Sequence, residues 1–237
     1  MRIALIGTGR MRRMIRDCAA DRGIEVAAEF NTATIAQLAQ CDRMDAVIDF
    51  SAPASLPALA AYVQRTGTPL VSGTTGYCDE EAARVNALGS YAPVALSANF
   101  SIGVAVLKHL AAEAAALLPD FDIEIIETHH RMKKDAPSGT AKLLLSAVNP
   151  DGTHPTVFGR EGFTPRTAGE IGVHAVRGGT VAGVHTVSFF GDEEELSLTH
   201  RAESRRIFAI GALKTAEKLK DAPVGLHTLD ELLFARR

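Results

Sequence analysis

Short apolar runs separated by helical segments fill the first hundred residues. Residues 2–6 form an apolar run that ends in glycines, and a helical pattern follows over 10–21. Further apolar runs lie at 24–30, 45–50, 68–72 and 93–97. Short, continuously apolar strands that alternate with helical segments are typical of a parallel sheet covered on both faces. We therefore predict an α/β domain with a parallel sheet.

The pattern changes after residue 100. Residues 102–118 are an Ala-rich helical segment, and residues 121–125 alternate apolar and acidic side chains, as in a strand with one buried face. The span 157–198 is rich in strand-like residues and glycines, and 204–220 returns to a helical period. We predict a smaller α+β domain with a mostly antiparallel sheet at 101–205. Residues 206–237 are expected to join 1–100 in the first domain.

Composition narrows the class of protein. The 237 residues are 46% hydrophobic and 22% charged, which is typical of a globular chain. A formal net charge of -3 argues against nucleic acid or an anionic membrane as the main partner. Three scattered cysteines form no CxxC pair, so we expect neither a disulfide framework nor a structural zinc site. The longest apolar stretch is interrupted by Lys108, His109 and Glu113, which argues against a membrane span. Since no targeting segment is evident, we expect a soluble protein of the cytoplasm.

A glycine-rich turn joins the first predicted strand to the first helix. The turn is Gly7-Thr8-Gly9, where glycines let the backbone approach a pyrophosphate and the helix N-terminus offers N–H groups. The third glycine of the GxGxxG pattern is replaced by Arg12. A tight turn without a ligand is the alternative reading.

Two other predicted strand ends favour a ligand at this edge. Residues 49–51 (Asp-Phe-Ser) and 73–76 (Gly-Thr-Thr-Gly) both follow strands, and ligands of open α/β sheets bind where the strand carboxyl ends meet. We therefore predict a dinucleotide site. Whether this site prefers NAD or NADP stays open. Glu29 or Asn31 lies at the end of the second strand, where an acidic residue would accept a hydrogen bond from a ribose 2′-hydroxyl and favour NAD. The arginines of the first helix are either a solvated face or a site for a 2′-phosphate.

The segment 127–142 carries the acid–base chemistry. His129 and His130 leave a predicted strand, and Lys133 follows in the same loop. Histidine titrates near neutrality and suits proton transfer. Residues 138–140 (Ser-Gly-Thr) read as the N-cap and first turn of a helix, which suits a carboxylate. The segment predicts a receptor for an anionic substrate that must also be protonated. Metal ligation and a solvated basic turn are the alternatives, and since no metal-ligand spacing accompanies the histidines we expect no metal.

These motifs together resemble the dihydrodipicolinate reductase (4-hydroxy-tetrahydrodipicolinate reductase) family of bacterial lysine and diaminopimelate biosynthesis. The resemblance covers nearly the whole chain. It rests on Gly7–Met11, Asp49–Ser51, Gly73–Gly76, Ser97–Val104, Glu127–Ala141, Glu170–Gly179 and His200–Ala202. The segment His-His-Arg-x-Lys-x-Asp-Ala-Pro-Ser-Gly-Thr-Ala is its most specific part.

The resemblance implies a Rossmann-type dinucleotide-binding domain (1–100 with 206–237) and a substrate-binding and oligomerisation domain (101–205), in a homotetramer. The implied reaction is the NADPH- or NADH-dependent reduction of a cyclic, imine-containing dicarboxylate to tetrahydrodipicolinate. His129 and Lys133 would be catalytic. The implied cofactor-binding residues are Gly7, Thr8, Gly9, Arg10, Met11, Arg12, Gly73, Thr74, Thr75, Ser97, Ala98, Asn99 and Phe100, with Glu29 or Asn31 at the ribose. The implied substrate-binding residues are His130, Ser138, Gly139 and Thr140.

Two other functions fit parts of the pattern. One is a two-domain NAD(P) dehydrogenase acting on a different imino or keto acid, which the His-His-Arg-x-Lys segment argues against. The other is a nucleotide-binding redox sensor without catalysis, which would need no proton-donating loop. The sequence departs from the family pattern at Arg12 and at Met132, where the family often has a polar residue.

Overall fold

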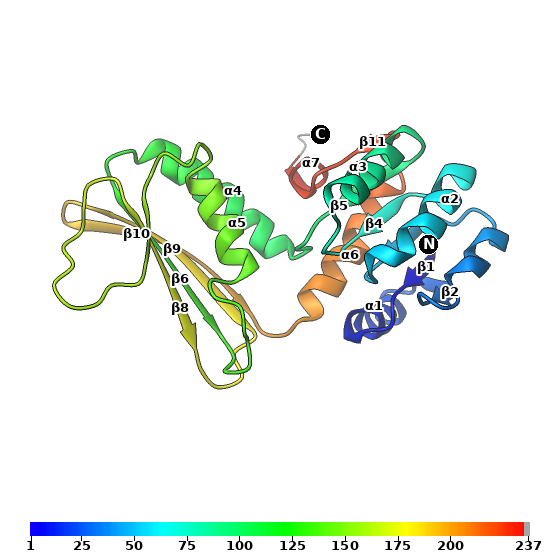
Figure 1. Cartoon of the computed structure of the whole chain (residues 1–237), viewed down its shortest axis with the longest axis horizontal. Helices are drawn as coiled ribbons and strands as arrows, with labels where there is room; N and C mark the ends of the chain where they lie inside the picture. Colours follow the sequence, from blue (N-terminus) through cyan, green and yellow to red (C-terminus); the bar gives the residue numbers. More distant parts are fainter. Residues whose placement is uncertain (235–237) are drawn as a thin grey trace. The chain divides into compact units, whose positions relative to one another are not determined.

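The computed structural model describes residues 1–234 and divides into two compact units (Figure 1). The first unit combines Met1–Ile102 with the chain from Arg206 onward, and the second is Gly103–Arg205. The chain therefore leaves the first unit once and returns to it.

A six-stranded parallel sheet forms the centre of the first unit. Its strands lie in the order β11-β5-β4-β3-β1-β2. They are β1 (Arg2–Ile6), β2 (Glu25–Phe30), β3 (Ala46–Asp49), β4 (Leu70–Ser72), β5 (Pro93–Leu96) and β11 (Gly225–Leu226). Every pairing between them is parallel, which confirms the predicted parallel sheet. The short β11 was not predicted.

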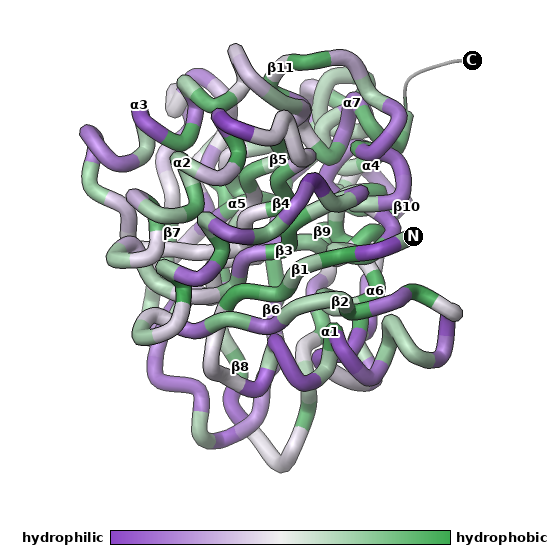
Figure 2. The backbone as a smooth tube through the Cα atoms, turned by 90° about the vertical axis from the view of Figure 1, so that its right-hand side faces the viewer, coloured by the Kyte–Doolittle hydropathy of each residue, from purple (hydrophilic) through white to green (hydrophobic). Residues whose placement is uncertain are grey.

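Helices cover both faces of this sheet because its strands are apolar on both sides. In β1, Ile3 and Leu5 pack with α1 (Arg10–Asp21) and α6 (Arg206–Leu219). Ala4 and Ile6 pack on the other face with α2 (Leu56–Thr66) and α3 (Asp79–Ala87). The neighbouring strands β3, β4 and β5 appear as apolar segments in Figure 2. Each fully buried aliphatic side chain contributes about 1.5–3 kcal/mol to folding.

Short elements complete the first unit. They are the 3-10 turns η1 (Ile35–Gln40), η2 (Pro53–Ser55) and η3 (Leu88–Ser90), and the helix α7 (Leu229–Phe234). Across residues 1–234, no helix has the length and apolar character that crossing a membrane requires.

A mixed five-stranded sheet forms the second unit, in the order β10-β9-β6-β8-β7. The strands are β6 (Asp122–His129), β7 (Thr156–Phe158), β8 (Ile171–Arg177), β9 (Gly183–Gly191) and β10 (Glu194–Ala202). The pairs β6-β9 and β9-β10 are antiparallel, as predicted, whereas β6-β8 and β7-β8 are parallel. Parallel pairing requires a long connection between strands, and the chain supplies one through α5 between β6 and β7 and another over residues 159–170 between β7 and β8.

One face of this sheet packs against two helices, α4 (Ile102–Leu117) and α5 (Gly139–Val148). In β6, Ile125 is fully buried on that face, and the alternation of the strand brings Glu127 and His129 to the same face. A buried glutamate and a buried histidine therefore follow directly from the register of one strand.

Candidate active site

Four backbone hydrogen bonds step across the carboxyl edge of the first sheet. Each joins the residue after one strand to the last residue of its neighbour. They run from Gly7 N to Phe30 O (2.9 Å), Phe50 N to Ile6 O (2.9 Å), Gly73 N to Asp49 O (2.8 Å) and Ser97 N to Ser72 O (3.1 Å). The predicted cofactor-binding loops thus lie side by side at one edge, where open α/β sheets bind their ligands.

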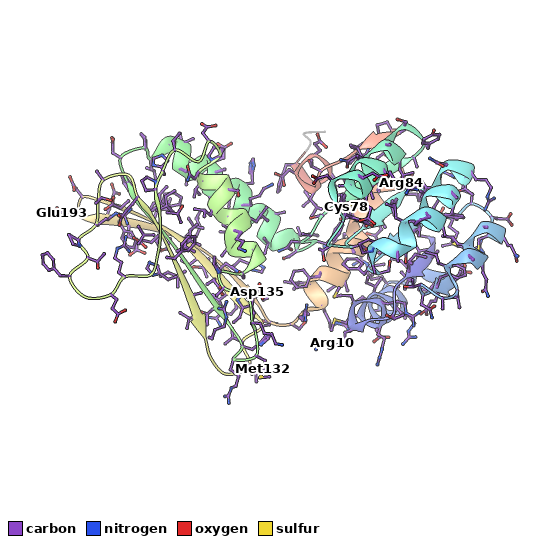
Figure 3. All side chains as sticks on the ribbon, in the orientation of Figure 1. Arg10, Cys78, Arg84, Met132, Asp135 and Glu193 are labelled. Atoms are coloured by element: carbon purple, nitrogen blue, oxygen red, sulfur yellow. The ribbon has the colours of Figure 1, made fainter. Side chains whose placement is uncertain are left out.

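The glycine turn fits a dinucleotide. Gly7 has φ +139, and a Cβ there would lie 2.5 Å from Phe50 O, so the position admits only glycine. Gly9 is the N-cap of α1, makes no side-chain cap hydrogen bond, and has open space where a Cβ would stand. The first N–H groups of α1 are therefore not satisfied by a capping side chain and can receive a phosphate. Arg10 opens the helix (Figure 3), and Met11 packs against the core.

Glu29 and Asn31 differ in what their side chains do. Glu29, next to last in β2, has its Oε2 3.3 Å from Arg12 Nε and its Oε1 3.7 Å from Arg16 Nη1. Asn31 Oδ1 accepts hydrogen bonds from the backbone N–H groups of Ala33 (2.8 Å) and Thr34 (3.0 Å). Asn31 therefore stabilises its own turn, and Glu29 is the carboxylate at the strand end.

Buried Asp49 holds two of the loops together. Its carboxylate accepts hydrogen bonds from the hydroxyls of Ser51 (2.5 Å), Ser72 (3.2 Å) and Thr74 (2.7 Å). Thr74 Oγ1 also accepts from Ser51 N at 3.0 Å. Burial raises the pKa of Asp49, even though the hydroxyls favour its charged form. The Thr74 hydroxyl is thus directed inward, and the exposed Thr75 is left at the surface of the loop.

The loop after β5 is braced by its own side chains. Ser97 Oγ donates to Asn99 O (2.8 Å) and accepts from Asn99 N (3.1 Å), while Ala98 is exposed. Phe100 is buried, with its ring tilted against that of Phe50 at 5.7 Å between centroids. Phe100 therefore anchors this loop in the core, and Ser97–Asn99 form the part of the loop that solvent or a ligand can reach.

In the second unit, Glu127 connects the predicted catalytic histidine to the start of α5. Its Oε2 lies 2.6 Å from His129 Nδ1, and its Oε1 accepts from Ser138 N at 2.9 Å. Because a carboxylate is only an acceptor, His129 Nδ1 carries the proton and Nε2 is the nitrogen that can exchange one. A Cβ at Gly183 would lie 3.0 Å from this Nε2, so glycine keeps space beside it.

Arg177 extends this network to the lysine loop. Its two Nη atoms donate to the two oxygens of Glu127 at 2.8 Å each, a bidentate pair, and Nη2 also donates to Asp135 O at 2.7 Å. The Asp135 carboxylate accepts from Lys133 Nζ at 2.9 Å on both oxygens. Met132 and Asp135 are labelled in this loop in Figure 3, and Met132 is exposed. Lys133 and His129 are therefore connected through Asp135, Arg177 and Glu127.

The network sets the protonation of its members. Burial raises the pKa of Glu127, but the hydrogen bonds from Arg177 and His129 outweigh it and keep the pKa lowered. Burial, together with the positive charges of Lys133 and Arg177, keeps the pKa of His129 lowered although the Glu127 carboxylate raises it. His129 therefore rests as a neutral imidazole beside a charged carboxylate.

Ser138 is the N-cap of α5, as predicted, and its Oγ accepts from Ala141 N at 3.2 Å. The same Oγ lies 3.0 Å from His185 Nε2, and burial lowers the pKa of His185 to about 4. Gly139 has open space where a Cβ would stand. His130 and Thr140 are partly buried, and His130 N donates to Val181 O at 2.8 Å. Ser138 thus holds the start of α5 in place through its contacts with Glu127 and His185.

Sequence reasoning assigned no role to Glu127, Arg177 or Asp49. Glu127 and Asp49 lie inside motifs that were recognised, but only burial distinguishes them from solvated carboxylates. Arg177 meets Glu127 across 50 residues of sequence, because β6 and β8 pair with His129 opposite Arg177. Within residues 1–234, no group of three or more His, Cys, Asp or Glu side chains is placed to hold a metal ion.

One unit has a parallel sheet with glycine-rich loops at its carboxyl edge, and the other has a sheet that carries acid–base side chains. This is the organisation of a two-domain nicotinamide-dependent oxidoreductase. Family models for the N-terminus and C-terminus of dihydrodipicolinate reductase match residues 1–100 and 103–233. The chain belongs to the dihydrodipicolinate reductase family, which confirms the resemblance read from its motifs.

Individual relatives agree with this assignment. Proteins named 4-hydroxy-tetrahydrodipicolinate reductase are 41% identical in Exiguobacterium sp. and 39% identical in Brachyspira hyodysenteriae. Each alignment covers 98% of this chain, with 95% and 100% of the respective relative. The fold is similar to that of a dipicolinate-bound dihydrodipicolinate reductase from Paenisporosarcina sp. TG-14, with a TM-score of 0.82, 21% identity and 99% of each chain covered.

Proposed function

We propose that this chain catalyses the NADPH- or NADH-dependent reduction of 4-hydroxy-tetrahydrodipicolinate to tetrahydrodipicolinate in lysine and diaminopimelate biosynthesis. The curated relatives carry the name of this activity. The observation that carries the proposal is the buried Glu127, which contacts both His129 and the start of α5. One carboxylate thereby links a proton-transfer group to a carboxylate-binding helix start.

The first unit binds the nucleotide in this proposal. Gly7, Thr8 and Gly9, with the backbone of Arg10 to Arg12, receive the pyrophosphate at the start of α1, and Glu29 lies at the adenine ribose. Gly73 to Thr75 and Ser97 to Phe100 hold the nicotinamide end. The bound cofactor supplies the hydride. The protein supplies position and excludes water, and the hydrogen-bonded loop edge keeps these groups rigid.

The second unit binds the dicarboxylate. His130, Gly139 and Thr140 receive the substrate carboxylates at the first turn of α5, where the positive end of the helix dipole lies, and Ser138 belongs to the same site as the N-cap of that turn. Ser138 is not a free donor through its backbone, since its N–H is bonded to Glu127. Its part is therefore to shape the turn from which its neighbours bind.

Lys133 and His129 move the proton. Hydride addition to a conjugated imine leaves an electron-rich group that takes up one proton. The Lys133 ammonium is the donor, held by Asp135. After Lys133 has given up its proton, His129, neutral and protonated at Nδ1, takes a proton from water at Nε2 and returns it to the Lys133 amine, while the Glu127 carboxylate stabilises the imidazolium that forms in between.

The active form is a homotetramer in the cytoplasm. Support for assembly comes from the second sheet, which exposes Ile126 (41%) and Val176 (47%) on the face opposite α4 and α5. A second copy that packs against this face would bury both side chains. Light scattering on the purified chain would measure its mass, and a monomer would contradict this part of the proposal.

Loss of reduced nicotinamide absorbance tests the activity directly. A coupled dihydrodipicolinate synthase would generate substrate from pyruvate and aspartate semialdehyde. Turnover with NADPH or NADH is expected. Nucleotide binding without turnover on this substrate would contradict the proposal, and a panel of imino and keto acids would then separate another dehydrogenase from a redox sensor.

A further inference from the structure

Arg12 stands where the glycine-rich turn has its third glycine in other dinucleotide-binding sheets, and it contacts the acidic end of β2. Its Nε lies 3.3 Å from Glu29 Oε2, and both side chains are about a quarter exposed. The more exposed Arg16 approaches the other oxygen of Glu29 at 3.7 Å. Two guanidinium groups thus share one carboxylate, and the Arg12 Nε atom is buried without a hydrogen-bond partner in the described chain.

The place of Glu29 in the sheet gives this contact its meaning. Glu29 pairs with Leu5 in the parallel register of β1 and β2, and the next residue, Phe30, accepts the hydrogen bond from Gly7 N. The carboxylate is therefore adjacent to the glycine turn. An acidic side chain here accepts hydrogen bonds from the ribose hydroxyls of NADH and repels the 2′-phosphate of NADPH.

We propose that Arg12 sets the choice between the two nucleotides, by neutralising Glu29 and donating to the 2′-phosphate of NADPH. This inference rests on the proposed nucleotide site and names its preferred ligand. The ion pair is partly buried, so solvent screens it less than a surface pair. Arg16 alone is the weaker partner, because it is more exposed and also lies 3.6 Å from Asp17. Asn31 is excluded as the determinant, since its side chain caps its own turn.

Binding of nucleotide fragments tests the inference without catalysis. Isothermal titration would compare adenosine 2′,5′-bisphosphate with AMP, which differ only in the 2′-phosphate, and would then compare NADPH with NADH. The variants are Arg12→Ala and the matched Arg13→Ala, which removes an exposed arginine from the same turn of α1. Glu29→Gln removes the carboxylate while keeping its size.

In Arg12→Ala, Kd for the bisphosphate is expected to rise about tenfold or more, the effect of one charged hydrogen bond, with Kd for AMP nearly unchanged. Arg13→Ala should leave the ratio of the two affinities unchanged, and Glu29→Gln should weaken NADH relative to NADPH. Equal changes for both fragments in Arg12→Ala, or equal effects of the two arginine variants, would overturn the role of Arg12. Failure of the unmodified protein to bind any of the four ligands would overturn the nucleotide site itself, and this inference with it.

Discussion

Glu127 and His129 lie two residues apart on the inner face of β6, with 2.6 Å between Glu127 Oε2 and His129 Nδ1. Glu127 is fully buried and carries the bidentate contact from Arg177. A buried carboxylate is costly unless it is paired, and Arg177 provides the pairing charge for Glu127. The paired carboxylate in turn fixes the orientation of the His129 ring through Nδ1. The glutamate is a positioning residue that acts through the histidine.

Glu127→Gln should lower kcat by at least about tenfold, because the amide can donate to Nδ1 and so favour the wrong imidazole tautomer. The pH dependence of kcat should also shift, since the imidazolium loses its carboxylate. Glu124→Gln is the control: it removes a carboxylate of the same strand that contacts Arg160 and His174 instead. A purely structural role for Glu127 would leave the pH profile in place and change only stability.

Lys133→Ala should reduce kcat by about two orders of magnitude or more, the usual loss when a positioned acid is removed. Nucleotide affinity should hold, since Lys133 belongs to the second unit. Lys134→Ala provides the comparison, because that neighbouring lysine is exposed. Steady-state kinetics and nucleotide titration measure both effects, and a near-normal kcat for Lys133→Ala would remove it from the mechanism.

Substitutions at Gly7 and Gly9 should affect different properties, the first the stability of the fold and the second the affinity for nucleotide. Gly7→Ala should lower the free energy of unfolding by more than about 2 kcal/mol, because φ is +139 and the new Cβ would meet Phe50 O. Gly9→Ala has open space and should fold normally, yet weaken nucleotide binding where the pyrophosphate approaches. Denaturant titration and nucleotide titration on both variants check this. Unchanged nucleotide affinity in Gly9→Ala would show that no ligand approaches that position.

Stability should fall on mild acidification because of His185. Its pKa in the folded chain is about 4, below the ordinary value of 6.5. Below pH 6.5 the unfolded chain takes up a proton that the folded chain refuses, so the stability is lost as pH falls from 6.5 to about 4, by at most about 3 kcal/mol.

The His185→Gln variant should show a smaller loss of unfolding free energy between neutral pH and about pH 5 than the unmodified protein. His154→Gln, which alters an exposed histidine, should retain the full pH dependence. Urea denaturation at several pH values provides the measurement. An unchanged slope in His185→Gln would assign the acid sensitivity to other groups.

Much of the first unit could be predicted because its strands are buried on both faces. The strands β1 (after Arg2), β3 and β4 consist of buried apolar residues up to Ile6, Ile48 and Val71, so they are evident without knowledge of their partners. By contrast, β11 has only two residues and no period of its own. It exists because Gly225 and Leu226 lie against Pro93 and Val94 of β5.

The site was predictable only where chemistry is carried by residue type. His129, Lys133 and the Ser138 cap stand in one short segment, and their spacing alone indicates acid–base work at a helix start. The role of Glu127 depends on Arg177, and the role of Asp49 depends on the hydroxyl of Ser51 in its own loop and on those of Ser72 and Thr74 at the end of β4. Such networks combine distant segments, so no local pattern reveals them.

The interrupted course of the first unit has a consequence for synthesis. A nascent chain that ends near Ile102 contains five of the six strands but lacks α6, whose Ala209, Ala212 and Leu213 cover one apolar face of the sheet. The second unit, by contrast, is continuous in sequence and is complete once Arg205 has emerged. The half of the protein that is made first therefore finishes folding last, because α1 alone covers that face of the sheet until α6 has been made.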